Sequence, residues 1–316
     1  MRALTIRGHR LEVDERPVPS ISGDELLVHV QAAGLNRPDL WRVAGGDPAP
    51  PGVPSDVPGL EFAGEVVAAG SETRRFRPGN LVMGLTEGGS HAEYVAVAES
   101  RCAAVPRGME MTVAGAVPES FVAAHDALVT QAGLRRGSRV MIHAVASGTG
   151  LAALQVAKLY GCEVAGTTRS AEKVEPCRAL GVDRPLQMSR DELPRDWADV
   201  VVDLVGGQYL AIDLDVAAHQ GWILLLGTMG GTVTPIDLRR LTGKGLTLRG
   251  STLRGRSVRE LAAAVAAFER DLAGPLADGR LRPVIAATFP LEEATTAYDL
   301  LRSNRSVGKV VLRLDT

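Results

Sequence analysis

Residues 139–173 read RVMIHAVASGTGLAALQVAKLYGCEVAGTTRSAEK, and this stretch decides the fold. It begins with a short apolar run, Arg139 to His143, which has the composition of a β-strand. The glycine-containing residues 147–150 follow, and apolar residues then recur at helical spacing from Leu151 to Lys158. A second apolar run, Cys162 to Thr167, starts about 20 residues after the first. This order predicts a βαβ unit, in which a helix crosses between two parallel strands.

The turn formed by Ser147, Gly148, Thr149 and Gly150 has the features of a dinucleotide site. A helix N-terminus presents N–H groups and a partial positive charge, and side chains in the turn would block a pyrophosphate. The pattern G-x-G-x-x-G/A fits Gly148, Gly150 and Ala153, although in another register only Gly150 matches. A tight turn without a ligand is the competing interpretation.

The end of the second strand bears on the choice of cofactor. NAD-binding sites normally have an Asp or Glu there, which accepts hydrogen bonds from both ribose hydroxyls. This chain instead has Thr168, Arg169 and Ser170, followed by Lys173. Arg169 and Lys173 suit a 2′-phosphate and Ser170 adds a hydroxyl donor, so the sequence predicts NADPH. In the competing interpretation these residues begin a solvated helix with Ser170 as its N-cap.

The composition indicates an ordinary globular protein. The 316 residues are 45% hydrophobic and 23% charged, and the formal net charge of −2 does not favour a nucleic-acid partner. The sequence has neither an apolar run of about 18 residues nor the apolar core of a signal peptide, so we expect a cytoplasmic protein with no membrane partner. Cys102, Cys162 and Cys177 lack C-x-x-C spacing, which predicts free thiols.

Two further strands, Val200 to Val205 and Ile223 to Leu226, are each followed by glycine. Strands and helices therefore alternate from about residue 119 onward, which predicts an α/β fold with a doubly wound parallel sheet. Ligands of such sheets bind beyond the carboxyl ends of the strands. The residues expected to line the nicotinamide end of the site are Val205, Gly206, Gly227, Thr228 and Met229. Close packing of the backbone, without a ligand, would explain the same glycines.

Both ends of the chain are predicted to form a second, β-rich domain. Before residue 118, short β-prone runs are separated by Gly and Pro, and after residue 283 the chain returns to β structure. The remaining elements expected from periodicity are strands at 26–31, 62–68, 80–83, 92–97, 246–250, 283–289 and 309–314, and helices at 121–132, 171–180, 258–272 and 291–303.

Several motifs recur in a fixed order along the chain. They are AGLNRPDL at 33–40, PGLE at 58–61, FRPGNLVM at 76–83, VPES at 117–120, GSTLR at 250–254 and NRSVGK at 304–309. With the 147–150 turn, they make the whole chain resemble the zinc-independent quinone oxidoreductases of the medium-chain dehydrogenase/reductase superfamily. The resemblance implies a GroES-like β-rich catalytic domain at residues 1–118 and 253–316, and a Rossmann NADPH-binding domain at residues 119–252.

The resemblance also implies roles for residues outside the glycine turn. Asn36 and Asn304 are expected near the nicotinamide and ribose, with Asn36 positioning the substrate, and Lys309 is expected to support the phosphates. The other cofactor contacts that it implies are Glu119, Ser251, Leu253 and Arg254.

No metal is expected from the same motifs. Zinc-dependent relatives carry Cys and His-Glu where this chain has Leu35-Asn36 and Leu60-Glu61. Scattered cysteines and histidines also offer no cluster of three or four zinc ligands. The resemblance places Leu246 to Ser251 at a sheet edge, where pairing across a two-fold axis would give a homodimer.

Three functions remain open at this point. The first is metal-free hydride transfer from NADPH to a quinone. The second, from the same superfamily, is reduction of the activated C=C bond of an enone or enoyl thioester. The third is a cofactor-binding protein with little turnover. The sequence favours the quinone modestly, because the reduced quinone can take its protons from water whereas an enolate gains more from a positioned proton donor.

Overall fold

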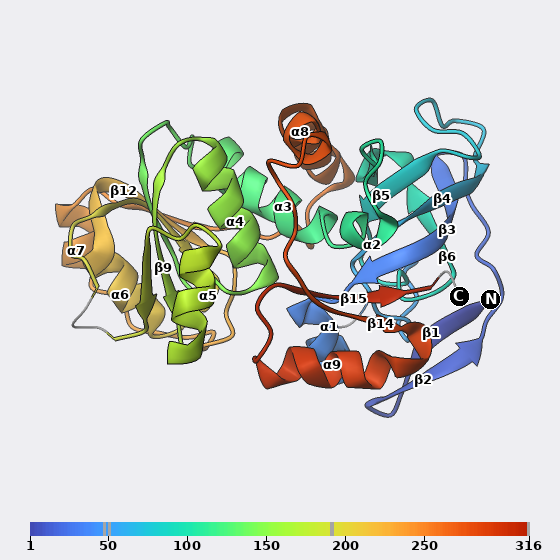
Figure 1. Ribbon diagram of the computed structural model, residues 1–316, viewed down its shortest axis with the longest axis horizontal. Helices are drawn as coiled ribbons and strands as arrows, with labels where there is room; N and C mark the ends of the chain where they lie inside the picture. The colour runs from blue at the N-terminus through green and yellow to red at the C-terminus, as the bar shows by residue number, and fades with distance from the viewer. Residues whose placement is uncertain (47–48, 50–51, 190–192, 315–316) are drawn as a thin grey trace. The chain divides into compact units, whose positions relative to one another are not determined.

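The computed structural model describes residues 1–46, 49, 52–189 and 193–314. The chain divides into two compact units (Figure 1). The first unit contains residues 1–122 and 256–316, and the second contains residues 123–255. Within the described ranges, no helix has the length and apolar character needed to cross a membrane.

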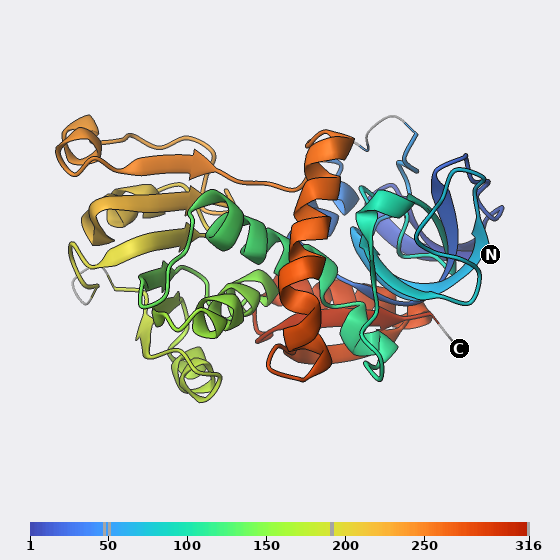
Figure 2. The ribbon, with the colours of Figure 1, turned by 90° about the horizontal axis from the view of Figure 1, so that it is seen from above.

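The second unit is built on a six-stranded sheet in which all neighbouring strands are parallel. Its strands are β8 (Arg139–Ile142), β9 (Glu163–Thr168), β10 (Arg184–Gln187), β11 (Ala198–Asp203), β12 (Ala217–Leu225) and β13 (Thr247–Gly250). They lie in the order β10-β9-β8-β11-β12-β13, with β13 at one edge (Figure 2). This is the strand order of a Rossmann fold, and the direction of winding reverses between β8 and β11. Ligands of such sheets bind at this switch point.

A row of apolar side chains crosses the middle of this sheet. Met141 of β8 lies beside Ala165 of β9 and Val201 of β11, and Val201 lies beside Ile223 of β12. All four side chains are fully buried, because helices cover both faces of the sheet. Helices α4 (Gly148–Leu159) and α5 (Val174–Ala179) lie on one face, and α6 (Tyr209–Val216) and α7 (Leu238–Gly243) lie on the other (Figure 1).

The first unit contains a mostly antiparallel sheet. Its strands are β14 (Ile285–Pro290), β15 (Lys309–Arg313), β3 (Glu25–Gly34), β4 (Glu61–Ala69), β5 (Leu81–Leu85) and β7 (Cys102–Ala104), in that order, with β6 (Tyr94–Ala98) also paired to β3. Only β14 and β15 run parallel among the described strands of this sheet. Because β15 pairs with β3, the C-terminal segment completes the core that the N-terminal segment begins.

Helices and a hairpin surround this sheet. The helical elements of the first unit are α1 (Arg37–Val43), η1 (Glu99–Arg101), α2 (Met111–Ala114), α8 (Val258–Ala277), η5 (Leu291–Glu293) and α9 (Ala294–Ser303). α9 buries Ala294, Ala297, Tyr298 and Leu301, which recur at helical spacing and pack into the core. Strands β1 (Arg2–Arg7) and β2 (Arg10–Glu15) form a separate antiparallel hairpin.

The elements expected from periodicity are present, with two informative differences. The helix expected at 121–132 is divided into α3 (Pro118–His125) and a π-helical segment, η2 (Asp126–Gln131). The hairpin β1–β2 was not expected, because β2 reads RLEVDE and contains only two apolar residues, Leu11 and Val13. Its turn at Gly8 and His9 has positive φ at both residues, which suits a tight hairpin.

Candidate functional site

The turn between β8 and α4 has the backbone geometry of an anion site. Ser147 is the N-cap of α4, and its Oγ accepts a hydrogen bond from the Gly150 N–H at 3.0 Å. A Cβ on Gly150 would lie 2.6 Å from the Ala144 carbonyl oxygen, so only glycine allows the helix to start this close to the strand. Gly148 and Thr149 form the first turn of this 12-residue helix. The N-terminus of α4 therefore lies at the carboxyl end of β8, where a pyrophosphate would fit.

The residues after β9 differ from a simple solvated helix start. Ser170 occupies the N-cap position of η3 (Ala171–Lys173), but its side chain makes no capping hydrogen bond. Its Oγ is buried and has no hydrogen-bond partner among the described residues, which is unusual for a buried hydroxyl. Thr168 is buried and donates its hydroxyl to the Ser170 carbonyl at 2.8 Å. The unpaired hydroxyl fits a hydrogen-bonding ligand better than an N-cap.

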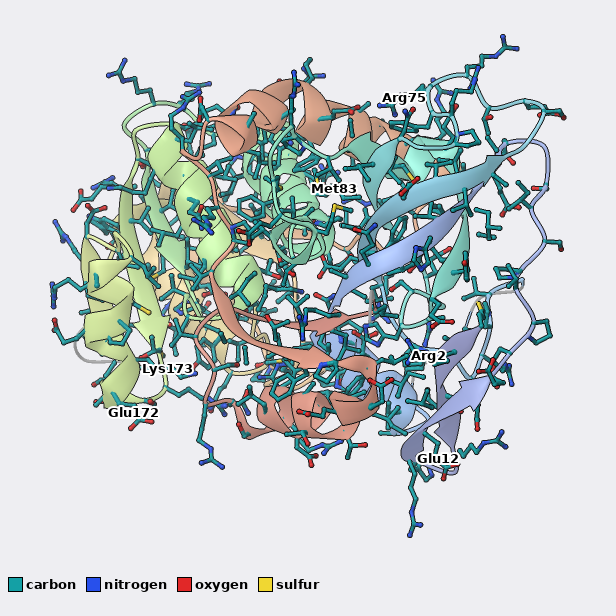
Figure 3. All side chains as sticks on the ribbon, turned by 45° about the vertical axis from the view of Figure 1, so that its right-hand side comes forward. Arg2, Glu12, Arg75, Met83, Glu172 and Lys173 are labelled. Carbon is teal, nitrogen blue, oxygen red and sulfur yellow. The ribbon has the colours of Figure 1, made fainter. Side chains whose placement is uncertain are left out.

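Two basic residues lie close to Ser170 in the sequence, Arg169 directly before it and Lys173 three residues after it. Arg169 is exposed and Lys173 is half-buried at the end of η3. Figure 3 shows Lys173 beside Glu172, with both side chains at the outer edge of the second unit. Residues 168–171, which are the last residue of β9 and the three residues after it, include no carboxylate. An Arg and a Lys beside a hydroxyl suit a phosphate monoester better than a pair of ribose hydroxyls.

The loops after β11 and β12 pack directly against each other. A Cβ on Gly206 would lie 2.6 Å from the Gly227 carbonyl oxygen, and one on Gly227 would lie 2.4 Å from the Leu204 carbonyl oxygen. The Gly230 N–H donates to the Val205 carbonyl at 2.7 Å. Close backbone packing alone therefore accounts for the glycines at 206 and 227. The sequence-predicted residues Val205, Gly206, Gly227, Thr228 and Met229 nevertheless lie together at the carboxyl ends of these strands.

Residues after β13 are held by the π-helical segment. Ser251 is buried, and its Oγ accepts a hydrogen bond from Gln131 Nε2 at 2.8 Å. Gln131 also donates to Asp126, at the other end of the same segment. Leu253 is buried as well, and Arg254 is half-buried. Gln131 was missed by sequence reasoning, because a π-helical turn has no periodic signal of its own.

A second cluster of polar residues lies inside the first unit. Lys309 Nζ donates to the Leu35 carbonyl at 2.9 Å, to Asn36 Oδ1 at 2.7 Å and to Glu61 Oε1. Asn36 Nδ2 donates to the same Glu61 oxygen at 2.9 Å. Glu61 Oε2 accepts from the Glu119 N–H at 2.9 Å. Lys309 is 5% exposed and Glu61 is fully buried, so this is a buried ion pair whose polar atoms are satisfied by hydrogen bonds.

Three residues that were expected to contact the cofactor have other contacts in or near this cluster. Lys309 was expected to support the cofactor's phosphates, but its three donors are directed to acceptors within the first unit. Glu119 contributes its backbone N–H to the Glu61 carboxylate. Asn304, expected near the ribose, is the left-handed C-cap residue of α9 at φ 59°, and its Oδ1 accepts from Arg37. Asn36 is 8% exposed.

Further buried polar groups fix the backbone of Asn36. Asp39 Oδ2 accepts from the Asn36 N–H at 2.7 Å, and its Oδ1 accepts from the Gly59 N–H at 3.1 Å. Burial raises the pKa of Asp39, while the charges and hydrogen bonds around it oppose that rise. His91 lies 2.9 Å from the Tyr298 hydroxyl, and burial lowers the pKa of its imidazole. These contacts hold the start of α1 rigidly.

The donor set of the first unit does not fit zinc. Leu35-Asn36 and Leu60-Glu61 stand where zinc-dependent relatives carry Cys and His-Glu, and the Lys309 ammonium contacts Asn36 Oδ1 and Glu61 Oε1. A cation cannot share that position with an ammonium group. Across the described ranges, no three His, Cys, Asp or Glu side chains are grouped so that they could hold a metal ion.

We expect Lys309→Met to destabilise the protein by about 3–5 kcal/mol, because it leaves the buried Glu61 carboxylate without a cation. Adding Glu61→Gln should recover much of this loss, since the amide can still accept from Asn36. Lys158→Met removes an exposed pair with Asp183 and should cost less than about 1 kcal/mol. Urea unfolding measures all three variants. Equal stability of Lys309→Met with and without Glu61→Gln would contradict the ion-pair assignment.

Comparisons with known proteins agree with this architecture. The alcohol dehydrogenase GroES-like domain profile matches residues 22–107, and the zinc-binding dehydrogenase profile matches residues 148–269. The chain is 29% identical to a solved NAD-dependent alcohol dehydrogenase, covering 99% of this chain and 100% of that one with a TM-score of 0.82. A mycobacterial protein solved with NADPH is 26% identical, covering 99% and 100% with a TM-score of 0.86. The two parts of the fold are thus a GroES-like domain and a Rossmann domain.

Two of the curated relatives illustrate the likeness at more than 30% identity. A polyketide synthase system protein of Streptomyces orinoci, NorB, is 36% identical over 92% of this chain but only 13% of its own length. A quinone oxidoreductase of Pseudomonas aeruginosa is 33% identical over 91% of this chain and 90% of its own length. With this relative matched end to end, and with both domains in place, the chain belongs to the quinone oxidoreductase family of the medium-chain dehydrogenase/reductase superfamily, whose members are nicotinamide-dependent oxidoreductases.

Proposed function

We propose that this protein is an NADPH-dependent oxidoreductase that passes hydride to a quinone without a metal. The single observation that carries the cofactor choice is the end of β9. There, Arg169 and Lys173 lie close in the sequence to Ser170, whose hydroxyl is buried and unpaired, and no carboxylate takes the place that ribose hydroxyls would need. These groups offer charge-assisted hydrogen bonds to a 2′-phosphate.

The rest of the cofactor contacts follow from the strand ends of the second unit. The N-terminus of α4 would hold the pyrophosphate, with Gly150 keeping the backbone accessible. The packed loops 204–207 and 227–230 would support the nicotinamide end. When bound, NADPH supplies the hydride. The task of the chain is then to hold the acceptor about 3–3.5 Å from the reactive carbon, since proximity can lower much of the barrier.

Asn36 is the residue that we expect to meet the nicotinamide or the acceptor in the first unit. Its amide oxygen accepts from Lys309 and its amide nitrogen donates to Glu61, so its orientation is fixed. Such a fixed amide can position a planar acceptor but cannot transfer a proton. A quinone fits this arrangement, because its reduced form can be protonated by water.

A second candidate is reduction of a C=C bond conjugated to a thioester. The 36% identity to a polyketide synthase system protein motivates this alternative. An enolate forms at higher pKa than a reduced quinone and would gain from a positioned proton donor. The buried cluster around Asn36 has Lys309 committed to Glu61, which does not favour that role. Cofactor binding with little turnover is the third candidate and predicts no steady NADPH oxidation with any acceptor.

We also propose a homodimer that forms along β13. β13 is an edge strand, and its residues Leu248 and Arg249 are exposed in the single chain. An unpaired edge can extend into a continuous sheet across a two-fold axis.

Replacing Lys173 by Ala should weaken NADPH binding by about 1.5–3 kcal/mol, the range for hydrogen bonds to charged groups. NADH binding should hardly change, because NADH has no 2′-phosphate. Cofactor titration by fluorescence measures both affinities. Glu172→Ala, a change at the neighbouring exposed residue, is the control and should not weaken NADPH. Equal losses of NADPH and NADH affinity in Lys173→Ala would refute the phosphate assignment.

Chelator-treated protein, shown to be metal-free by elemental analysis, should oxidise NADPH with quinones at the untreated rate. The acceptor panel should contain quinones, enones and enoyl thioesters, with a sample lacking any acceptor as the control. Activity that disappears on chelation and returns with zinc would exclude a metal-free reaction. Turnover of enones or enoyl thioesters far above every quinone would instead select the second candidate.

Light scattering should give a mass of twice 33.3 kDa at micromolar concentration. Leu248→Lys should shift the protein toward the monomer, because like charges would face each other across the two-fold axis. Val18→Lys changes another exposed apolar residue, in the first unit, and should leave the mass unchanged. A monomeric wild-type protein would contradict pairing through β13.

A further inference from the structure

Three ionisable residues are buried together in the second unit and have no part in the proposed hydride transfer. His143 follows β8, Asp203 ends β11, and Asp213 lies on α6. All three are fully buried. β8 and β11 are the strands at which the winding of the sheet reverses. The cluster therefore lies at the strand ends where the cofactor is proposed to bind.

The imidazole of His143 is held on three sides. Its Nδ1 lies 2.9 Å from Thr167 Oγ1, and its Nε2 lies 3.0 Å from Asp213 Oδ1. The edge of its ring contacts Tyr209, with ring centroids 5.0 Å apart. In the described part of the chain, no N–H group donates to either oxygen of Asp213, and His143 Nε2 donates to none. An ionised carboxylate in this position would be buried with no donor, so the contact is best explained by a proton on Asp213 that is donated to Nε2.

Asp203 connects this cluster to the backbone turn at residues 204–207. Its Oδ1 accepts from the Val205 N–H at 2.7 Å and from the Gly206 N–H at 2.9 Å. The same turn packs on the loop after β12 through Gly206 and Gly227. Burial, followed by the nearby charge of Asp213, raises the pKa of Asp203 to about 7. Burial raises the pKa of Asp213 to about 8, and its contact with Asp203 opposes that rise.

We propose that Nε2 of His143 and the carboxyls of Asp203 and Asp213 share a single proton, and that this proton keeps the 204–207 turn in its observed conformation. With the proton on Asp213, Asp203 alone carries the charge and its oxygens accept from the turn. His143 is then neutral, accepting at Nε2 and donating from Nδ1 to Thr167. Under the proposed function this turn supports the nicotinamide end of NADPH, so the proton also sets the affinity for the cofactor.

Loss of the proton would place two negative charges beneath the turn. Thr167 and Tyr209 face the cluster directly. Arg169 acts on it less directly, because its charge lies close enough to affect Tyr209. Of these only Arg169 is cationic, and its exposed side chain lies in solvent, where its charge is screened. Two buried carboxylates would therefore repel each other, and Asp203 would move with the turn that it holds.

The direction of the pH effect follows from these pKa values. Folding raises the pKa of both carboxyls above the ordinary value of about 3.9. Their contribution to stability is therefore complete below about pH 3.9 and is lost as pH rises from there through the folded pKa values of about 7 and about 8. Burial lowers the pKa of His143 to about 4, so His143 opposes folding only as pH falls below about 6.5. Measurements above about pH 6.5 isolate the carboxyl pair.

Hydrogen exchange of the cofactor-free protein tests the proton directly. Between about pH 6.5 and about pH 9, the peptide that contains residues 203–209 should become about tenfold less protected, after correction for intrinsic exchange. A factor of about ten in the opening equilibrium corresponds to a shift of one pKa unit. Asp213→Asn mimics the protonated carboxyl and should show no such loss. Asp203→Asn, which also removes one carboxylate, should behave in the same way. Asp215→Asn makes the same change two residues along α6, beside Arg240, and should retain the wild-type response.

The affinity for NADPH should follow the same pattern. Wild type and Asp215→Asn should bind NADPH about fivefold more weakly at about pH 9 than at about pH 7, whereas Asp213→Asn should bind equally at both. Protection that does not change with pH in wild type would overturn the proposal. So would a loss of protection in Asp213→Asn and Asp203→Asn that equals the loss in wild type. Failure of wild type to bind NADPH at any pH would reject the proposed function instead, and the exchange measurement would still decide the shared proton.

Discussion

The first unit depends on the buried ion pair between Glu61 and Lys309. Burying two charges is expensive, and here the expense is offset by hydrogen bonds from Asn36 and from the Glu119 backbone to the same carboxylate. The pair joins β4 to β15, two strands that are far apart in the sequence. Gly34 makes room for it, because a Cβ there would lie 2.3 Å from Glu61 Oε1. One carboxylate thus fixes the strand ends, the orientation of Asn36 and the start of α3.

The fold of both units was largely predictable from the sequence, because the signals involved are local. Apolar runs bounded by glycine located β8, β9, β11 and β12, and helical spacing located α4. The Ser147–Gly150 turn was predicted for the same reason. The hairpin β1–β2 escaped prediction because β2 has only two apolar residues, and its pairing with β1 gives no signal in the sequence of β2 itself.

The polar clusters were less predictable, because they are assembled from residues that are distant in sequence. Lys309 is followed by an apolar strand and gives no sign that its partners are Asn36 and Glu61. Gln131 became a neighbour of Ser251 only through the π-helical turn. The sequence around Asp203, by contrast, contains a pattern from which its role could have been predicted. An acidic residue that ends an apolar strand directly before a turn with Gly206-Gly207 suggests a carboxylate accepting from the turn's N–H groups.

The two units bury acidic groups in different ways, and the difference has consequences for their response to pH. Glu61 is neutralised by the Lys309 ammonium group, which lies in hydrogen-bond contact with it. Asp203 and Asp213 have no such cation beside them, so only a proton can remove one of the two charges. A buried cation makes a site insensitive to pH, whereas a buried proton makes it responsive. Loss of this proton should therefore be felt in the second unit, beneath the turn that Asp203 holds.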